Sequence, residues 1–454
     1  MYNEILSYLK KDIYPFHMPG HKRNPKFLPP NWLDLDLTEI PGLDVLSSPT
    51  GIIARFQQKI AGIYGANHSF FLVNGASAGI LAAVCATCAD GGTLVVPRNA
   101  HTSVYNAMAL SGAIPSYIVP QLTPDGLAGG IPPAALDNMP QGAVVLVVSP
   151  TYEGFVSDIA AIAAQVHRKG GVLIVDEAHG AHFAFSKKFP VSALSCGADI
   201  VVQSLHKTLP APSQCAILHV NSHRVDINRL KFHINAVQTS SPSYILMSVC
   251  DYMLDMLWRQ PMYFESYVQR LESLHKRLPG AKSAAPLRLS GAERVGSCGI
   301  YDVDPGKLLF TAFTNTGADT IANTMAAAYK VQMEMAAGRH VLAMTSVADT
   351  DEGFDRLAAA IEGLNGITVC EPAVGAATCA LQLPPPPFFL PEMVLPPRQA
   401  ASLPSKTVPW EAAAGQVSAQ LIACYPPGTA LVAPGERIPA GLLKTASHIS
   451  VLQL

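Results

Sequence analysis

The sequence predicts an α/β protein with a large domain built on a mostly parallel sheet and a smaller α+β domain at the C-terminal end. Short apolar runs rich in β-branched residues, such as Val172–Val175, alternate with helical patterns along the first half of the chain. This alternation is typical of parallel sheets that are covered by helices. With 454 residues the chain exceeds one ordinary core, so two domains are expected.

Each element of the alternating region has its own signal. The first strand ends in the turn dipeptide Asn-Gly, and a stretch of small residues suited to a helix follows it. The later strands have the length and the β-branched content of buried strands. Strands are expected at Ser69–Val73, Thr93–Val96, Val144–Val148, Val172–Val175, Ile200–Gln203 and Cys215–Val220, and helices at Ser77–Cys88, His101–Leu110 and Asp158–Lys169, the last with Ser157 as its N-cap.

The second half of the chain does not continue the alternation of strands and helices. From about residue 221 to 278 the pattern is helical, and the elements that follow are shorter. We therefore predict an N-terminal arm at 1–34, a large domain at 35–280 and a small domain at 281–454. The Pro-rich segment Leu383–Arg398 cannot form a regular helix or a central strand. It is expected to cross the surface as ordered chain, because its aromatic residues need burial.

The composition excludes several classes of protein. The net charge is −2 without basic clusters, so neither nucleic acid nor an anionic membrane is an expected partner. No apolar run reaches the roughly 18 residues of a membrane span, and the N-terminus lacks signal-peptide features. Cys85 and Cys88 lie in an Ala-rich stretch without a second Cys or His pair, so they are interpreted as helix residues and no metal is expected. A cytoplasmic protein is the plain expectation.

Two charged residues follow expected strands, where open α/β sheets bind ligands. Asp176 follows four apolar residues, so its carboxylate would need a cationic or donor partner, although it could also cap the next turn. Lys207 is expected in the loop directly after another apolar strand, beside Ser204 and His206. A lone loop lysine is usually solvated, but in a partly dry site a lysine loses its proton more easily and can form an imine.

Upstream residues complete a possible cofactor site. Gly75 permits a tight turn, and the free N–H groups of the next helix can cradle a phosphate together with Ser77, although Gly-x-Ser alone is common at helix starts. His101 could lie flat against an aromatic ring or could face water at a helix start. A phosphate cradle, a stacking imidazole, a carboxylate for a pyridinium nitrogen and an imine-forming lysine are together the parts that a pyridoxal 5'-phosphate (PLP) site requires.

The motifs around these residues resemble those of the Orn/Lys/Arg decarboxylase family, which are fold type I PLP enzymes, along nearly the whole chain. DEAHGAHF and SLHKTLP surround Asp176 and Lys207, FHMPGHK (Phe16–Lys22) precedes them, and YPPGTALVAPGERI (Tyr425–Ile438) follows. TEIPGLDVLSSPTG, NGASAG, RNAHTSVYNA, PTYEG and QTSSPSY also match in order and spacing. The resemblance implies the PLP-dependent transferase (aspartate aminotransferase) fold, in a compact member without the N-terminal wing domain of some relatives.

The resemblance also implies roles for the matching residues. Lys207 would be the Schiff-base lysine and Asp176 the partner of the pyridine nitrogen, while His101 would stack on the ring and His179 would lie beside it. These four are the predicted catalytic residues, and all four would also contact the cofactor.

The remaining cofactor contacts concern the phosphate. The residues expected to hold it are Gly75, Ala76 through its backbone N–H, Ser77, Ser204 and His206. Relatives often have a hydroxyl where Ala76 stands. Ser240 and Ser241 would reach the phosphate of a neighbouring subunit, which implies a homodimer with shared active sites.

The activity that the resemblance implies is decarboxylation of arginine, lysine or ornithine to an amine of polyamine biosynthesis. A cationic substrate needs an acidic partner, and the candidates are Glu39, Asp44 and Glu436, for each of which a surface or capping role is an equal explanation. An aminotransferase or lyase of the same fold is the alternative, because it would keep the cofactor residues. A transaminase would anchor the substrate carboxylate with an arginine, for which the candidates are Arg288, Arg294, Arg339, Arg356, Arg398 and Arg437. A non-catalytic homologue would be expected to lack Lys207 or Asp176, and the chain has both.

Overall fold

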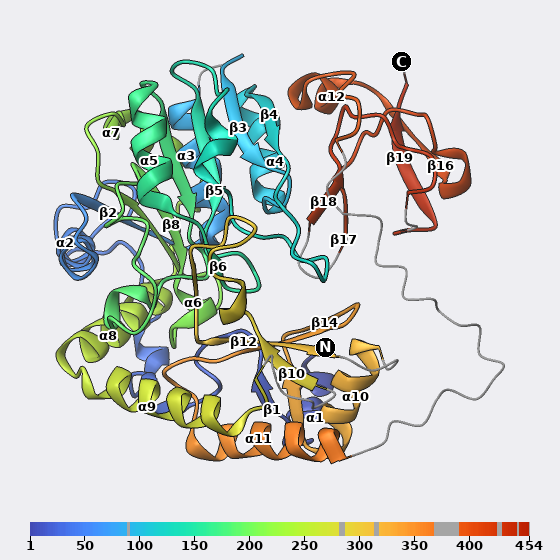
Figure 1. Ribbon diagram of the computed structural model, residues 1–454. Helices are drawn as coiled ribbons and strands as arrows, with labels where there is room; N and C mark the ends of the chain where they lie inside the picture. The colour runs from blue at the N-terminus through green and yellow to red at the C-terminus, as the bar shows by residue number, and fades with distance from the viewer. Residues whose placement is uncertain are drawn as a thin grey trace, which may run out of the picture.

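A twisted central sheet forms the core of the molecule (Figure 1). The computed structural model describes residues 1–88, 91–280, 287–312, 317–366, 390–424, 429–442 and 445–453. In this part of the chain the central sheet has seven strands in the order β2-β9-β8-β7-β5-β3-β4. The strands are β2 (His68–Leu72), β3 (Thr93–Pro97), β4 (Ile114–Ile118), β5 (Val144–Val148), β7 (Val172–Asp176), β8 (Ile200–Ser204) and β9 (Ala216–Val220). β9 runs opposite to the other strands, so the pairs β2–β9 and β9–β8 are antiparallel and the remaining four pairs are parallel, which confirms the mostly parallel sheet.

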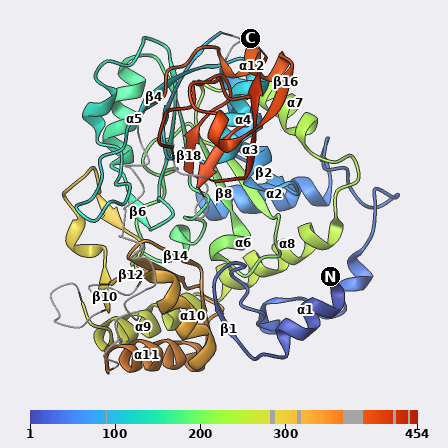
Figure 2. The same cartoon turned by 90° about the vertical axis from the view of Figure 1, so that its right-hand side faces the viewer.

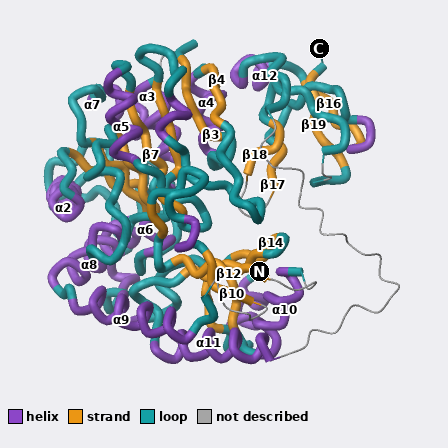
Figure 3. Tube along the Cα trace, viewed as in Figure 1, coloured by secondary structure: helices purple, strands orange, loops and turns teal. Residues whose placement is uncertain are grey.

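Helices cover both faces of this sheet (Figure 3), because its strands are apolar on both sides. Along β5, Val144 and Leu146 belong to one buried cluster, and Val145 and Val147 belong to the other. The first face is covered by α3 (Gly75–Thr87), α4 (Thr102–Ser111) and α7 (Ile227–Val237), and the second by α2 (Ile52–Tyr64), α5 (Ile159–Arg168) and α8 (Tyr244–Arg259). The core of the large domain is therefore divided into two layers by the sheet.

A second, antiparallel sheet lies at the opposite end of the molecule from β3 and β4 (Figure 1). Its strand order is β10-β12-β15-β14, with β10 (Leu287–Ser290), β12 (Lys307–Ala312), β14 (Met335–Ala337) and β15 (His340–Met344). The helices α9 (Met262–Arg277), α10 (Ala318–Ala328) and α11 (Asp351–Gly366) pack around it. A two-stranded pair, β6 (Phe155–Val156) with β11 (Asp302–Val303), joins this small body to the large domain.

The N-terminal arm is part of the small body. It contains α1 (Tyr2–Leu9) and β1 (Tyr14–Phe16), and β1 pairs in parallel with β13 (Val331–Met333). Lys22 is buried, and its Nζ donates to the carbonyl of Met344 at 2.7 Å. The arm thus connects the first residues of the chain to strands that lie more than three hundred residues later.

The described residues from 390 onwards form a third body, whereas the sequence predicts a single small domain at 281–454. This body contains α12 (Pro397–Ser402), β16 (Ser405–Pro409), β17 (Ile422–Cys424), β18 (Thr429–Val432) and β19 (His448–Leu452), arranged as two antiparallel pairs. It packs beside α4 at the β3–β4 side of the large domain, away from the second sheet (Figures 1 and 2). Its buried residues pack against the large domain: Ala430 and Ala433 belong to the cluster that contains residues of α3 and α4, and Glu436 pairs with Arg98. Most of the predicted crossing at 383–398 lies outside the described residues.

Other boundaries differ in detail. The N-cap of α5 is Asp158, whose carboxylate accepts from the N–H of Ala161, whereas the hydroxyl of Ser157 accepts from the N–H of Ile131. Lys207 does not lie in a loop but in the short helix α6 (Leu205–Thr208). Strand β4 was not among the expected elements, because its alternating, partly exposed residues carry a weaker signal than the buried runs. Short 3-10 turns occur at Pro25–Phe27, Trp32–Leu35, Pro133–Leu136, Phe183–Phe185, Ala292–Arg294 and Trp410–Ala412.

Membrane-spanning helices, metal clusters and cysteines can be checked against the structure. Within the described ranges, no helix has the length and apolar character needed to cross a membrane. The same ranges contain no cluster of three or more His, Cys, Asp or Glu side chains that could hold a metal ion. Cys85 lies in α3 and Cys88 at its C-cap, and both are free thiols. Cys88 packs into the buried cluster beneath α3, in agreement with its interpretation as a small apolar residue.

Candidate active site

A cavity of about 400 Å³ opens at the carboxyl ends of the central strands, where open α/β sheets bind ligands. Its wall consists of residues that follow β3, β5, β7 and β8, the first turn of α3, and Met18 of the arm. The lining residues are Met18, Gly75, Ala76, Ser77, Ile80, Asn99, His101, Ser103, Ala128, Val148, Pro150, Thr151, Tyr152, Glu153, Asp176, Ala178, His179, Ser204, His206 and Lys207. All four predicted catalytic residues and the five predicted phosphate residues therefore line one cavity.

Lys207 is positioned by the junction of β8 and α6, one turn of helix that begins where the strand ends. Its Nζ lies 3.1 Å from Nε2 of His179. Burial lowers the pKa of Lys207, and the carboxylates of Asp176 and Glu334 act in the opposite direction. A lysine with a lowered pKa supplies the unprotonated amine that imine formation requires.

Asp176 is the last residue of β7 and is only 5% exposed. Its Oδ1 accepts a hydrogen bond from the N–H of Ala178 at 3.2 Å. Asp176 therefore caps the turn that follows the strand and also lines the cavity. Capping the turn does not prevent its carboxylate from facing a ligand. A buried carboxylate at this place can hold a proton on a basic nitrogen of a ligand.

The N-terminus of α3 forms the anion-binding part of the wall. Gly75 has φ +77°, a left-handed conformation that glycine adopts without strain, and it opens the helix. No side chain caps this helix end, and Ser77 in its first turn is exposed toward the cavity. Free N–H groups at a helix start bind phosphate oxygens. Ser204 and His206 face the same space from the end of β8 and from α6.

Two histidines complete the wall. His101 is the N-cap of α4, and its Nδ1 accepts from the N–H of Ser103 at 3.2 Å. His179 is buried, with Nε2 toward Lys207 and Nδ1 2.7 Å from Nζ of Lys307. Burial lowers the pKa of both imidazoles, and that of His179 falls well below its usual value. Both rings are therefore neutral at neutral pH.

This set of residues fits PLP. The uncapped helix start suits its phosphate, the buried carboxylate suits its pyridine nitrogen, and the amine of Lys207 suits its aldehyde. Ser240 and Ser241, in contrast, are exposed and do not line the cavity of their own chain.

Several polar residues at the site had no predicted role, among them Tyr152, Glu153, Lys307 and Glu334. Tyr152 and Glu153 line the cavity within the PTYEG motif, and that motif could have identified them. The hydroxyl of Tyr152 donates to Oε1 of Glu334 at 2.6 Å, and Oε2 of Glu334 accepts from the N–H of Met18 at 2.9 Å. Lys307 and Glu334 belong to the small body, so only the packing of the two bodies brings them to the site.

Two of the three predicted substrate carboxylates, Asp44 and Glu436, have structural partners. Asp44 is buried and accepts five backbone N–H groups around the start of α2. Glu436 is 1% exposed and forms a two-pronged ion pair with Arg98, at 2.7 and 2.6 Å. Neither carboxylate lines the cavity of its own chain. Glu39 does not line it either, but its buried Oε1 has no hydrogen-bond partner among the described residues.

None of the six candidate arginines lines the cavity. Arg294 pairs with Asp125, Arg356 with Glu352 and Asp12, and Arg437 with Glu392. Arg339 and Arg398 donate to the backbone carbonyls of Ala312 and Leu110. Within the described part of one chain, the cavity thus lacks the arginine that would anchor a substrate carboxylate for transamination.

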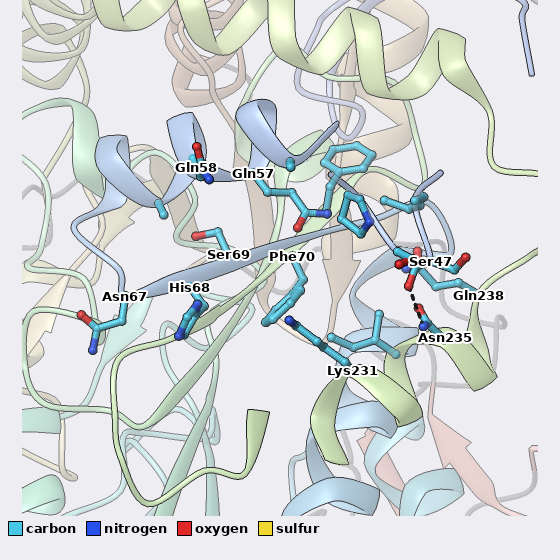
Figure 4. A pocket seen from close by; sticks show the side chains of 17 residues that line it. Ser47, Gln57, Gln58, Asn67, His68, Ser69, Phe70, Lys231, Asn235 and Gln238 are labelled. Atoms are coloured by element: carbon cyan, nitrogen blue, oxygen red, sulfur yellow. Dashed lines mark hydrogen bonds between the residues drawn. The ribbon is translucent and has the colours of Figure 1, made fainter. Parts of the chain in front are cut away.

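A second cavity of about 290 Å³ lies between α2, β2 and α7 (Figure 4). Amide and hydroxyl side chains dominate its wall, among them Gln57, Asn67, Ser69 and Gln238. It has no carboxylate in its lining, and its cation Lys231 is exposed. The chemistry of the first cavity therefore identifies that cavity as the candidate active site.

Comparisons with known proteins show the family to which the chain belongs. Residues 1–334 match the Orn/Lys/Arg decarboxylase major domain, and residues 388–453 match the C-terminal domain of the same family. The chain is 33% identical to the uncharacterized protein YaaO of Bacillus subtilis over 99% of this chain and 94% of that protein. It is 30% identical to the arginine decarboxylase of Bacillus subtilis over 96% of this chain and 91% of that protein.

Among solved structures, the lysine decarboxylase LdcF of Francisella novicida superposes with a TM-score of 0.76 at 18% identity, covering 94% of this chain and 76% of that one. That likeness confirms the predicted fold. Because the family match spans both the cavity residues and the C-terminal body, the chain belongs to the Orn/Lys/Arg decarboxylase family.

Proposed function

We propose that this chain is a PLP-dependent arginine decarboxylase that releases CO2 and agmatine. The observation that carries the reaction type is the cavity itself, which brings Lys207, Asp176 and two neutral histidines together and has no arginine among the described residues that line it. The full-length similarity to a protein named arginine decarboxylase supports arginine as the substrate. A cytoplasmic location and a place in polyamine biosynthesis stay predictions from the sequence.

The predicted site residues that line the cavity would each have a defined role toward PLP. When bound, PLP supplies an electron sink for the electron pair that remains when a carboxylate leaves as CO2. Lys207 would bond the cofactor covalently, and Asp176 would keep the proton on its ring nitrogen, which strengthens that sink. The first turn of α3, with Ser77, Ser204 and His206, would hold the phosphate, and His101 would pack on the ring. His179 would hold a proton near Lys207.

A homodimer with shared sites is part of the proposal. Ser240 and Ser241 are exposed outside their own cavity, so they could reach a phosphate only in another subunit. Exposed apolar side chains occur in the segments near this loop: Trp32, Ile40, Val45 and Phe232. The amide of Asn235 donates to the carbonyl of Ser47, which holds two of these segments together. Glu39 lies in one of them, and a partner's substrate cation would satisfy its unpaired carboxylate oxygen.

The experiment is a search for amine products by mass spectrometry. The purified chain with PLP is incubated separately with arginine, lysine and ornithine, and Lys207→Ala serves as the blank. Agmatine that appears only with the intact chain supports the proposal, because the variant lacks the amine that bonds the cofactor.

Two other outcomes would contradict parts of the proposal. Cadaverine or putrescine in place of agmatine would keep the reaction and overturn the substrate. A chain that holds PLP but makes no amine from any of the three amino acids would overturn the reaction. After borohydride reduction, covalent PLP should be found on Lys207 and be missing in Lys207→Ala.

A further inference from the structure

Lys307 is a buried cation that contacts the active site from outside the cavity. It begins β12 of the small body and is 4% exposed. Its Nζ lies 2.7 Å from Nδ1 of His179, whose Nε2 lies 3.1 Å from Nζ of Lys207. One imidazole therefore bridges two lysines, one from each body of the protein.

Proton counting restricts the states of these three groups. A neutral imidazole has one N–H and one nitrogen that accepts, whereas an ammonium group only donates. His179 is neutral, because burial and the neighbouring lysines lower its pKa well below the usual value. Both lysines cannot donate to the same neutral ring. When both hydrogen bonds are formed, one of the two lysines must be the unprotonated amine.

The surroundings favour the charged form at Lys307. The carbonyl of Tyr152 accepts from its Nζ at 3.2 Å, and Nζ lies 5.4 Å from the centre of the Tyr152 ring, a cation–π arrangement. The titratable groups that face it are the carboxylates of Asp304, Glu334 and Glu153, which raise its pKa, and Lys207, which lowers it. Burial lowers the pKa of Lys307 to about 8, which leaves it mainly protonated at neutral pH.

The surroundings of Lys207 differ. Among the described residues, Nζ of Lys207 has one hydrogen-bond partner, Nε2 of His179. No carbonyl or carboxylate oxygen of these residues accepts a hydrogen bond from this Nζ. An ammonium at Lys207 would therefore compete with Lys307 for the one accepting nitrogen of His179, whereas an amine would accept from Nε2–H.

We propose that Lys307 is a positioning residue: its ammonium donates to Nδ1 of His179, which places the imidazole proton on Nε2 and leaves Lys207 as the unprotonated amine. Lys307 acts through His179, since it does not line the cavity. The inference rests on the proposed function for its purpose, because imine formation with PLP requires a free amine at Lys207.

The first test measures where His179 carries its proton. Imidazole nitrogen chemical shifts are recorded on the full chain labelled with ¹⁵N-histidine after removal of PLP, because bound PLP would convert the amine of Lys207 into an imine. The signal that disappears in His179→Gln identifies the residue. At pH 7 the wild type should show a protonated Nε2 and an unprotonated Nδ1, and Lys307→Met should show a mixture or the reverse. A proton on Nδ1 of His179 in the wild type would overturn the proposal without reference to any variant.

The second test measures the reactivity of Lys207. The full chain without cofactor is mixed with PLP at pH values from 6 to 10 and reduced with borohydride, and the modified Lys207 is quantified by mass spectrometry. Lys307→Met should react about tenfold more slowly at pH 7, as expected if the pKa of Lys207 rises by about one unit. Lys307→Arg keeps the charge and should react like the wild type, and Lys188→Met, a surface lysine paired with Glu272, is the matched control.

A slow reaction in Lys307→Met that Lys307→Arg does not share supports the proposal. Equal rates for Lys307→Met and the wild type across the pH range would overturn it. If Lys307→Met does not fold, Lys307→Gln replaces it and the wild-type nitrogen shifts still decide. Neither test uses arginine or detects an amine, so a failed decarboxylase assay leaves both readouts interpretable.

Discussion

Asp44 shows how the backbone can use a carboxylate that the sequence suggests for a substrate. Its Oδ1 accepts from the N–H groups of Val45 and Thr50, and its Oδ2 accepts from those at the start of α2, the shortest from Gly51 at 2.7 Å. Burial acts to raise the pKa of Asp44, but these hydrogen bonds outweigh it and lower the pKa to about 2. The carboxylate therefore stabilises the fold in its ionised form.

Asp44→Asn should destabilise the protein by about 1–2 kcal/mol at pH 7, as for the loss of a helix cap that binds several N–H groups. Because the folded pKa lies below the unfolded one, this stabilisation is complete above about pH 4 and is lost as the pH falls toward 2. Urea unfolding from pH 7 to pH 3 should show the gap between the wild type and the variant narrowing. A gap that is constant over this range would show that the charge of Asp44 is not involved.

At the scale of residues, the sequence located the residues that line the cavity, but its local patterns did not show which carboxylates are free to contact a substrate. Lys207, Asp176, His101 and His179 follow short apolar strands, and that local signal locates them at one edge of the sheet. Whether a carboxylate is available to a substrate depends on which hydrogen-bond donors of the folded chain already bind it. For Glu436 the donor, Arg98, lies 338 residues away, so no local pattern could reveal the pair.

At the scale of elements, α3 carries the phosphate cradle and packs very closely on the sheet. A Cβ at Gly79 would lie 2.7 Å from Cδ1 of Leu72 in β2 and 2.9 Å from Cγ1 of Val202 in β8. Only a residue without a side chain lets the helix approach the strands this closely. The position of the cradle relative to Lys207 therefore depends on a glycine one turn further along the helix.

Gly79→Val should cost about 1–3 kcal/mol through overpacking, and it should also weaken PLP binding, because α3 must move away from β2 and β8. Urea unfolding measures the first effect, and titration of the cofactor-free chain with PLP measures the second. Gly62→Val is the matched control, since a Cβ at that helical position meets nothing within 4 Å, and its change in stability should stay within about 0.5 kcal/mol. Unchanged PLP affinity in Gly79→Val would contradict the link between packing and cradle.

Local patterns predicted most elements of the large domain, because buried parallel strands are continuous apolar runs. They did not predict β4, whose residues are partly exposed, nor the one-turn helix that carries Lys207. Four residues are too few to show helical periodicity. The N-cap of α5 was misplaced by one residue, since Ser157 and Asp158 are both good caps and the tertiary contact of Ser157 with Ile131 decides between them.

At the scale of the whole molecule, a buried ion pair attaches the C-terminal body to the large domain. Arg98 is fully buried and binds both oxygens of Glu436, and its Nη2 also donates to the carbonyl of Leu431 at 2.9 Å. Arg98 directly follows β3 and lies three residues before His101. The same contact therefore orders the loop that carries a predicted catalytic histidine.

Arg98→Met should destabilise the protein by about 3–5 kcal/mol, because it leaves the Glu436 carboxylate buried without its cation. Adding Glu436→Leu to Arg98→Met should recover part of that loss, since no unpaired charge then remains. Urea unfolding measures both changes, and limited proteolysis should release the C-terminal body from Arg98→Met first. Arg437→Met, which breaks the exposed pair with Glu392, is the control and should cost less than about 1 kcal/mol. Equal costs for the two arginines would argue against Arg98 as the anchor.

The sequence by itself determined the α/β class, the mostly parallel sheet and the placement of a lysine and a carboxylate at strand ends. These features depend on short-range apolar patterns and on the rule that parallel strands end at one edge. Only the tertiary structure decided that the described residues from 390 onwards form a body of their own, that Asp44 and Glu436 have structural partners, and that Lys307 meets His179. Lys307 and His179 are 128 residues apart and belong to different bodies of the protein, so their contact follows from how the two bodies pack and not from any local pattern.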